Sequence, residues 1–372
     1  MHEDDLITEE RPLSLPINLG LNDGTICPQS CIDVMQLHTS RTSLRHYTSA
    51  DNEPLLDVIC KVDGVNPENI YLAHGSGPIL KQCIPYLIRK KIKGSTRRIA
   101  RHLISKSGYP IISGHLTYFK VPIKAMNLGL TVRLLPLKPE NDFKLMVDDV
   151  EGVLKKGDGL VYICNPNNPT GQLMMERDEI EYLAKKYPSS LFWVDEAYVQ
   201  YLDRAEHQYL SDLVPQYDNL CVSRTFSFAY GLAGVRMGYL LSSAARIKEF
   251  ESQVTNYRYG TLQEKLAAAA LTDDDHLVQL RKMTAIDRDG VMAHLKRYEG
   301  LEAYESKTHF ILCKFTDDRT GQWLGDELNK RGIKIKVFKP VPGQDYTSHF
   351  RITLGVKNEN AYLCEQLDDL LG

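Results

Sequence analysis

The stretch LVYICNPNNPTG at residues 160–171 decides the fold class, because a short apolar run ends abruptly in a rigid polar turn. Val, Ile and Tyr favour an extended strand, and the Pro, Asn and Gly residues that follow enforce a turn. The same order recurs in LFWVDEAY at 191–198 and in LCVSRTFSFAYGLAGVR at 220–236, with room for helices between the runs. Buried parallel strands joined by helices have this pattern. The sequence therefore predicts an α/β protein whose strand ends carry polar side chains.

Composition narrows the class of protein. The 372 residues are 43% hydrophobic and 25% charged, with 45 Lys and Arg against 48 Asp and Glu. This balance favours a soluble globular protein of two packed units over a nucleic-acid binder. The eight cysteines show no CxxC pair and no Cys/His ligand spacing, so we expect no metal site and no disulfide scaffold. An acidic N-terminal stretch and the lack of a long apolar run predict a cytoplasmic protein without a membrane partner.

The pattern of elements changes near residue 270. Beyond it, long helical stretches alternate with a few short strands, which predicts a smaller α+β unit. The N-terminal residues, rich in Pro, Asn and Gly, are too few to form a unit alone. We therefore expect an N-terminal arm at 1–40 that joins the small unit, a large unit at 41–270 with a mostly parallel sheet, and a small C-terminal unit at 271–372.

The near-neutral total hides an uneven distribution of charge. Residues 69–139 contain thirteen Lys or Arg and no Asp or Glu, and the segment 89–102 is the densest part. An anionic partner, such as a phosphorylated substrate, an acidic carrier protein or a nucleic acid, would explain the segment. A solvated basic helix neutralised by acidic surface elsewhere is the alternative. Nucleic acid is the less favoured partner, because no aromatic residues are interleaved with the charges.

Polar side chains follow three successive predicted strands. Asn168 lies in the turn after the first strand, Asp195 and Tyr198 close the second, and Thr225 and Ser227 follow the third. Open α/β sheets bind ligands at the carboxyl ends of their strands. A sheet with only a structural role would not require three polar strand ends in succession, so we expect a binding site at this edge.

A glycine turn, GSGP at 75–78, supplies a further candidate site. It follows a strand-like run and precedes an apolar helical pattern. Glycines before a helix with proline in its first turn expose backbone N–H groups to an anion. The turn is therefore a candidate phosphate-binding loop.

Taken in order, these motifs resemble the fold-type-I pyridoxal-phosphate enzymes, and among them the histidinol-phosphate aminotransferases and threonine-phosphate decarboxylases. The resemblance covers nearly the whole chain. It implies a large unit with a mostly parallel sheet, a small C-terminal unit joined by the N-terminal arm, and an active site in their cleft. It also implies a homodimer.

The resemblance assigns the ring-binding and substrate-binding residues. Asp195 would pair with the pyridine nitrogen and keep the ring an electron sink, while Tyr198 and Asn168 would hydrogen-bond the phenolic oxygen. Arg351 would bind the substrate carboxylate next to Asn168. A structural ion pair remains the alternative role of Arg351.

The resemblance also assigns a phosphate site. Tyr47 matches a tyrosine that reaches the phosphate from the neighbouring subunit, although simple packing is the alternative. The residues expected to bind the phosphate within one chain are Gly75, Ser76, Gly77, Thr225, Ser227 and Arg236.

The catalytic lysine of the family is missing. The family places it eight residues before the phosphate-binding arginine, and that position here is Phe228. A misaligned lysine does not explain the difference, because no Lys occurs between Lys186 and Lys248. Phenylalanine can neither form a Schiff base nor move a proton. We therefore expect pyridoxal or pyridoxamine phosphate to be held non-covalently.

Two further departures lie near the expected coenzyme. Counting back from Phe119 puts Leu116 at the position where relatives stack an aromatic ring on the coenzyme, with His115 and Tyr118 as alternatives. His115 is also the candidate base in place of the lysine. Pro78 stands near the position of the family's acidic residue after the glycine turn.

Two functions stay open. The first is an aminotransferase-like enzyme of the pyridoxal-phosphate family, acting on an amino acid or amino-phosphate without a lysine tether in specialised biosynthesis. The second is a catalytically silent homologue that binds coenzyme, an amino-acid adduct or a phosphorylated ligand. A deliberate single replacement of the lysine is disfavoured, because Leu116 and Pro78 also depart from the family.

Overall fold

The computed structural model describes residues 12–37, 54–93, 109–127, 129–205, 207, 209–253, 259–340 and 344–372. Tyr47 lies outside these ranges. So does most of the basic segment 89–102, since only the backbone of residues 89–93 is described.

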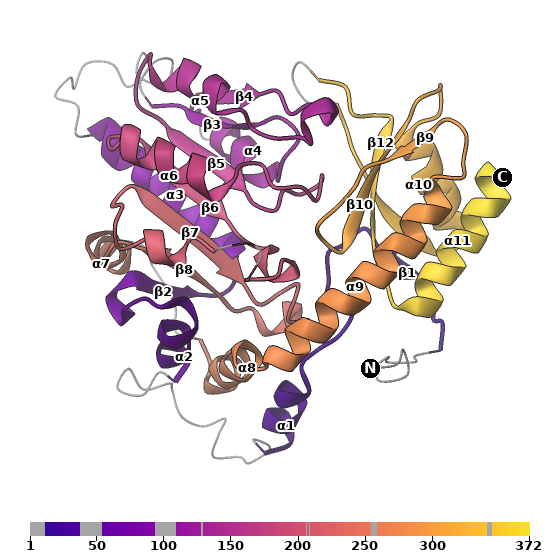
Figure 1. Ribbon diagram of the computed structural model, residues 1–372, viewed down its shortest axis with the longest axis horizontal. Coiled ribbons are helices and arrows are strands. Elements are labelled where there is room, and N and C mark those ends of the chain that lie inside the picture. The colour runs from indigo at the N-terminus through magenta and orange to yellow at the C-terminus, as the bar shows by residue number, and fades with distance from the viewer. Residues whose placement is uncertain are drawn as a thin grey trace.

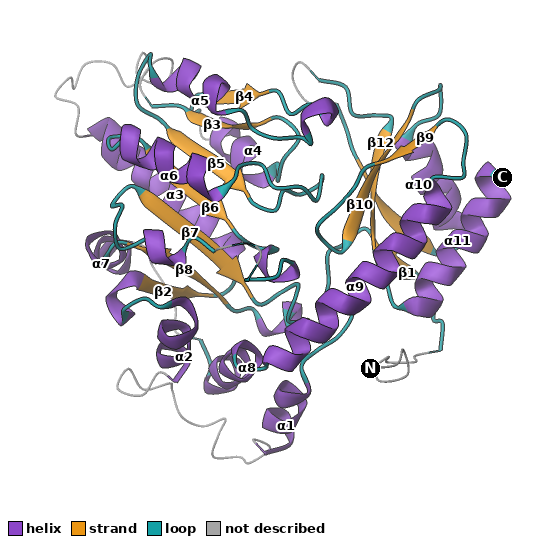
Figure 2. Ribbon diagram, in the orientation of Figure 1, coloured by secondary structure: helices purple, strands orange, loops and turns teal. Residues whose placement is uncertain are grey.

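The larger of two β-sheets carries helices on both faces (Figures 1 and 2). Its strand order is β2-β8-β7-β6-β5-β3-β4, and β8 runs antiparallel to both of its neighbours while the other pairs are parallel. The α/β prediction with a mostly parallel sheet is thus confirmed. The strands are β2 (Ile70–Ala73), β3 (Ile111–Gly114), β4 (Val132–Leu135), β5 (Leu160–Cys164), β6 (Leu191–Asp195), β7 (Leu220–Thr225) and β8 (Gly238–Ser242).

The helices that accompany this sheet explain its apolar strands. Every residue of β5, β6 and β7 is buried, as expected for parallel strands covered on both faces. The helices are α1 (Gln29–Leu37), α2 (Pro54–Asp63), α3 (Ser76–Lys93), α4 (Lys120–Asn127), α5 (Val147–Leu154), α6 (Arg177–Lys186), α7 (Ala244–Gln253) and α8 (Thr261–Leu271).

The smaller sheet has the strand order β1-β11-β12-β10-β9 and helices α9, α10 and α11 beside it (Figure 1). Strand β1, from the N-terminal part of the chain, pairs in parallel with β11 and so ties that part to this sheet. The elements are β1 (Ile17–Leu19), β9 (Leu301–Ala303), β10 (Phe310–Phe315), β11 (Ile333–Val337), β12 (His349–Thr353), α9 (Asp274–Leu295), α10 (Gly321–Lys330) and α11 (Lys357–Leu371).

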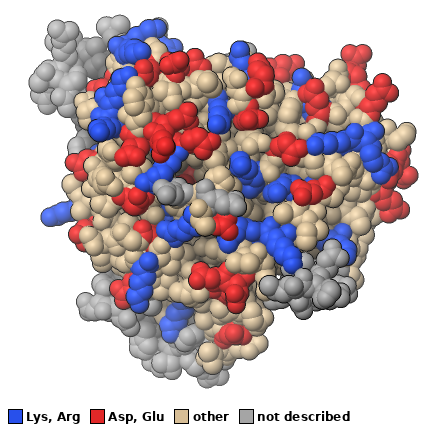
Figure 3. All heavy atoms as spheres, viewed as in Figure 1, with Lys and Arg blue, Asp and Glu red and all other residues tan. Residues whose placement is uncertain are grey.

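Helix α9 connects the two units: it starts beside α8 and ends against the small sheet (Figure 1). The Asp273 side chain caps its start by accepting a hydrogen bond of 3.1 Å from the backbone N–H of His276. None of the helices within the described residues combines the length and the apolar character needed to cross a membrane. Basic and acidic side chains are interspersed over the face shown in Figure 3.

A fully buried arginine links α2 to the large sheet. Arg224 on β7 donates from Nε to Glu196 Oε2 at 2.8 Å and also pairs with Asp63, the last residue of α2. The Tyr239 hydroxyl on β8 donates to Asp63 Oδ2 at 2.9 Å. Because a buried charge without its partner is costly, this network fixes α2 against the sheet.

We predict that Asp63→Asn lowers the free energy of unfolding by about 3–5 kcal/mol, the cost of leaving a buried charge with one partner removed. Asp57→Asn is the matched control, since Asp57 is exposed in the first turn of the same helix and should cost less than about 1 kcal/mol. Urea denaturation of both variants measures the difference. Equal losses would contradict a structural role for the Arg224 network.

Candidate active site

Parallel pairing brings three of the predicted motifs to one edge of the large sheet. Asp195, the last residue of β6, lies opposite Cys164 at the end of β5 and opposite Ser223 on β7. The NPNNPTG turn follows β5 directly, and Thr225 is the last residue of β7. The side chains that the sequence placed at three strand ends are therefore neighbours in space.

Asp195 is a buried carboxylate without a cation. Its two oxygens accept hydrogen bonds from the Tyr162 hydroxyl at 3.0 Å and from Ser223 Oγ at 2.9 Å. Trp193 Nε1 donates to Ser223 Oγ at 3.0 Å and so orients it. Burial raises the pKa of Asp195 to about 6, and no Lys or Arg among the described residues pairs with it. A cationic N–H group of a ligand would supply the missing partner.

The Tyr198 hydroxyl accepts hydrogen bonds from two amides, Asn22 Nδ2 at 2.7 Å and Asn168 Nδ2 at 2.9 Å. No group among the described residues accepts its proton, so the hydroxyl can donate to an oxygen of a ligand. Burial raises the pKa of Tyr198, which keeps the phenol protonated. Asn22, on the N-terminal part of the chain, was missed by the sequence analysis because no motif surrounds it.

Arg351 on β12 faces the same cluster. Its Nη1 donates to Asn168 Oδ1 at 2.6 Å and its Nη2 to the carbonyl of Gly20 at 2.8 Å, while its guanidinium lies 5.1 Å from the centre of the Phe310 ring. Burial lowers the pKa of Arg351 to about 10. No carboxylate pairs with it within the described residues, and its Nε is buried without a hydrogen-bond partner. Such a cation is suited to bind an anion.

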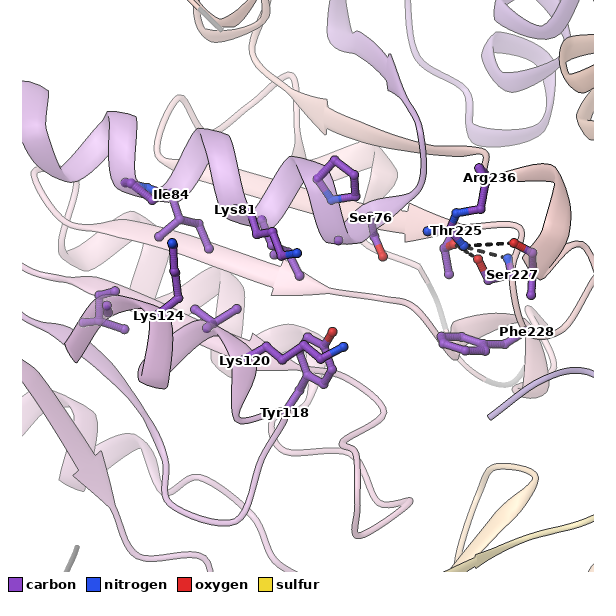
Figure 4. A pocket seen from close by; sticks show the side chains of 18 of the residues that line it. Ser76, Lys81, Ile84, Tyr118, Lys120, Lys124, Thr225, Ser227, Phe228 and Arg236 are labelled. Carbon is purple, nitrogen blue, oxygen red and sulfur yellow. Dashed lines mark hydrogen bonds between the residues drawn. The ribbon is translucent and has the colours of Figure 1, made fainter. Parts of the chain in front are cut away.

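The candidate phosphate residues meet in a cavity of about 350 Å³ (Figure 4). Ser76 and Gly77 begin helix α3, where backbone N–H groups have no partner within the helix. Gly75 has φ +87°, and a Cβ at this position would lie 3.1 Å from Arg236 Nη2. Glycine is therefore required here by the backbone conformation, and it lets the arginine approach the turn.

Hydroxyl groups and a guanidinium complete this end of the cavity. Thr225 Oγ1 donates to Ser227 Oγ at 2.9 Å and accepts from the Ser227 backbone N–H at 3.2 Å. Arg236 Nη1 donates to the Ala233 carbonyl at 2.9 Å, which leaves its other N–H groups toward the glycine turn. A helix start, hydroxyls and a guanidinium together form a cradle for a dianion.

Phe228 joins the cradle to the ring-binding cluster. Its side chain lines the cavity beside Ser227 and stacks on Tyr198, with ring centres 4.7 Å apart and planes inclined by 15°. Asp195, Asn168 and Tyr198 themselves do not line the cavity. The structure thus brings most of the expected phosphate residues together at the cavity, and Phe228 links this cavity to the hydrogen-bonded pair Tyr198 and Asn168.

The structure places Tyr118, and not Leu116, at the cavity. Leu116 is 4% exposed and does not line it, whereas Tyr118 does (Figure 4). Thr117, between these two residues, donates a hydrogen bond of 2.7 Å from Oγ1 to Asn167 Oδ1. Phe119 is exposed and lies outside the cavity. The assignment of Leu116 to the stacking position stays a prediction, because the expected ring-binding residues do not line this cavity either.

His115, the candidate base, contacts the small unit. Its Nδ1 is hydrogen-bonded to the Tyr346 hydroxyl, and burial lowers the pKa of His115 below its usual value. It does not line the cavity. No cluster of three or more His, Cys, Asp or Glu among the described residues could hold a metal ion.

Comparison with known proteins defines the class. Residues 94–367 match the model of the class I and II aminotransferases, and the chain belongs to this family.

Curated relatives and solved structures agree with this assignment. The chain is 27% identical to histidinol-phosphate aminotransferase of Thermoanaerobacter pseudethanolicus over 345 residues, 92% of this chain and 90% of that protein. It is 31% identical to the Bacillus cytotoxicus enzyme of that name over 274 residues, 73% and 71% of the two chains. The Sinorhizobium meliloti enzyme in complex with pyridoxal-5'-phosphate superposes with a TM-score of 0.79 at 22% identity, covering 96% of this chain and 92% of that one. The structure of the Clostridium acetobutylicum enzyme superposes with a TM-score of 0.79 at 18% identity, covering 95% of this chain and 98% of that one. These structures share the fold.

The raised pKa of Asp195 predicts that ionisation of this side chain destabilises the folded protein as the pH rises. The folded state holds this proton more tightly than the unfolded chain, so the stabilisation is present below about pH 4 and is lost as the pH rises through about 6. Asp195→Asn should remove this loss of stability, because asparagine does not ionise. Its free energy of unfolding relative to wild type should therefore rise by about 2–2.5 kcal/mol between pH 4 and pH 7.5 in protein without coenzyme.

Asp212→Asn is the control, because Arg177 lowers the pKa of Asp212 and the sign should reverse. Urea denaturation at several pH values measures both variants. A pH-independent difference between Asp195→Asn and wild type would show that folding does not shift the pKa of Asp195.

Proposed function

We propose that this protein binds pyridoxal phosphate or pyridoxamine phosphate non-covalently and acts on an amino acid or amino-phosphate as an aminotransferase-like enzyme. One observation carries the proposal. Phe228, eight positions before Arg236, lines the anion cradle around that arginine and stacks on Tyr198, and Asp195, three residues before this tyrosine, is a buried carboxylate without a cationic partner among the described residues.

The residues present fit the coenzyme. Asp195 would hold a protonated pyridine nitrogen, and Tyr198 would donate its unused proton to the phenolic oxygen. Ser76, Ser227 and Arg236 would hold the phosphate dianion. When bound, the coenzyme supplies an electron sink for charge that develops at the substrate Cα.

The chain's own groups would bind and orient the substrate. The unpaired Arg351 would bind a carboxylate, and its 2.6 Å bond to Asn168 keeps that cation next to Tyr198. Tyr118 is our candidate for covering the coenzyme ring, because it lines the cavity with Phe228. These contacts favour a fixed orientation of substrate and ring before any bond changes.

Proton transfer requires a group other than Phe228, which has no ionisable atom. His115 remains our candidate base, since its lowered pKa leaves the imidazole neutral at physiological pH and able to accept a proton. Its bond to Tyr346 fixes the ring against the small unit.

The relatives' name suggests the substrate class by analogy. Those proteins are histidinol-phosphate aminotransferases, so an amino-phosphate used in specialised biosynthesis is the substrate we favour. We further propose a cytoplasmic homodimer in which the partner's Tyr47 completes the phosphate site. We propose that each chain consists of an arm at 1–40, a large unit at 41–270 and a small unit at 271–372. From the density of Lys and Arg in segment 89–102, we also propose that this segment binds an anionic partner.

A silent homologue that only binds the coenzyme or a phosphorylated ligand is the second candidate. The stack of Phe228 on Tyr198 favours it, because an apolar ring then occupies the neighbourhood of the ring-binding phenol. The two candidates share the binding site and differ in whether turnover occurs.

Arg236→Ala tests the phosphate site. Losing a charged hydrogen-bond partner should weaken coenzyme binding by about 2–3 kcal/mol, or about 30- to 150-fold, in an equilibrium titration followed by absorbance. Arg246→Ala removes the same charge from a half-buried arginine that lies outside the cavity and donates to the Asp218 carbonyl, and it should leave the affinity unchanged. Equal affinities of wild type and Arg236→Ala would reject the cradle.

Phe228→Lys tests the position of the missing lysine. If Asp195 and Tyr198 orient the ring as proposed, the new amine should attach to the coenzyme, and borohydride should make the attachment permanent in the intact mass. Phe228→Leu is the control and should gain no mass. A folded, coenzyme-binding Phe228→Lys that stays unmodified would contradict the proposed orientation. Amino-group transfer by wild type at the rate of Phe228→Lys would exclude the silent homologue.

A further inference from the structure

The cavity continues beyond the phosphate cradle as a groove between α3 and α4. Three lysines point into this space: Lys81 from the second turn of α3, and Lys120 and Lys124 from α4 (Figure 4). Lys120 and Lys124 are four residues apart and therefore share one face of their helix. We call Lys81, Lys120 and Lys124 the lysine groove. Neither the proposed coenzyme contacts nor the proposed substrate contacts use it.

The lysine groove has no counter-charge. None of its three lysines forms an ion pair within the described residues, and Asp23 is the sole acidic residue among those that line the cavity. The surrounding segment 69–139 supplies no Asp or Glu at all. Three ammonium groups around one space repel each other, and this repulsion falls when an anion binds between them.

The floor of the groove is apolar. The apolar residues that line the cavity here are Leu80 and Ile84 of α3, Val121 and Ala125 of α4, and Leu130. Lysine side chains commonly lay their stems on such surfaces and keep the ammonium group at the rim. An apolar floor beneath a cationic rim fits a ligand with an organic body and an anionic group.

We propose that the lysine groove binds the phosphate of a small phosphorylated organic molecule, next to the coenzyme phosphate in the Arg236 cradle. Three point charges suit a dianionic phosphate better than a single carboxylate. The cavity of about 350 Å³ includes the Arg236 cradle, and the part that remains as the groove takes a small molecule and not an extended polymer, which favours a metabolite over a nucleic acid. The proposal rests on the proposed function only in assigning the cradle to the coenzyme.

Titration calorimetry with phenyl phosphate on coenzyme-loaded protein at low ionic strength tests the proposal. We expect one saturable site per chain, with inorganic phosphate binding more weakly because it does not cover the apolar floor. The double variant Lys81→Met/Lys124→Met should bind phenyl phosphate about tenfold or more weakly, with coenzyme affinity unchanged.

The double variant Lys156→Met/Lys334→Met is the matched control, because it removes the same net charge from exposed lysines outside the cavity. It should retain wild-type affinity. Equal weakening in both double variants would show that the effect depends only on the net charge of the protein, and it would overturn the proposal. The absence of saturable binding to wild type would also overturn it.

A second arm separates this proposal from the coenzyme assignment. In coenzyme-free Arg236→Ala, phenyl phosphate should still bind, and adding Lys81→Met/Lys124→Met should weaken that binding about tenfold or more. If Arg236→Ala alone abolishes it, the anion occupies the cradle and the lysine groove is not a site. This comparison is valid even if wild type binds no coenzyme, in which case only the proposed function fails.

Discussion

The side chain of Asn168 holds the candidate site together, because it is hydrogen-bonded to both units of the protein. Its amide nitrogen donates to Tyr198, which follows β6 of the large sheet, and its oxygen accepts from Arg351 on β12 of the small sheet. Asn22 adds a third connection, since it donates to Tyr198 and accepts from Thr353 at 2.9 Å. The small sheet and the N-terminal part of the chain are therefore connected to the large sheet through hydrogen bonds that converge on one tyrosine hydroxyl.

Around this link the protein buries two charges of opposite sign without ionic partners among the described residues. Asp195 is stabilised by two hydroxyls alone, and Arg351 by an amide and a carbonyl oxygen. Each arrangement is less favourable than an ion pair would be. Burial therefore raises the pKa of Asp195 and lowers the pKa of Arg351. A ligand with a cationic N–H near one and an anionic group near the other would remove both costs. The site is thus built for binding more than for stability.

Sequence patterns predicted the large sheet and most of the polar cluster, because strands and turns are local features and parallel strands align their ends. Contacts between distant segments were harder to foresee. Asn22 lies 176 residues from the tyrosine it contacts, and the lysine groove combines helices from either side of the undescribed residues 94–108. Counting from Phe119 pointed to Leu116 and could not show that the side chain of Tyr118 turns into the cavity. The stack of Phe228 on Tyr198 depends on a side-chain direction that spacing alone does not fix.

The central claim is that the binding apparatus for pyridoxal phosphate persists in a chain that holds the coenzyme without a covalent bond. The most direct test is the amount of coenzyme bound to wild type before and after denaturation, with and without borohydride. The account predicts about one coenzyme per chain in the native protein, all of it released on denaturation in both cases. Coenzyme that stays on a lysine of the denatured, reduced protein would contradict the account, as would a native protein that binds none.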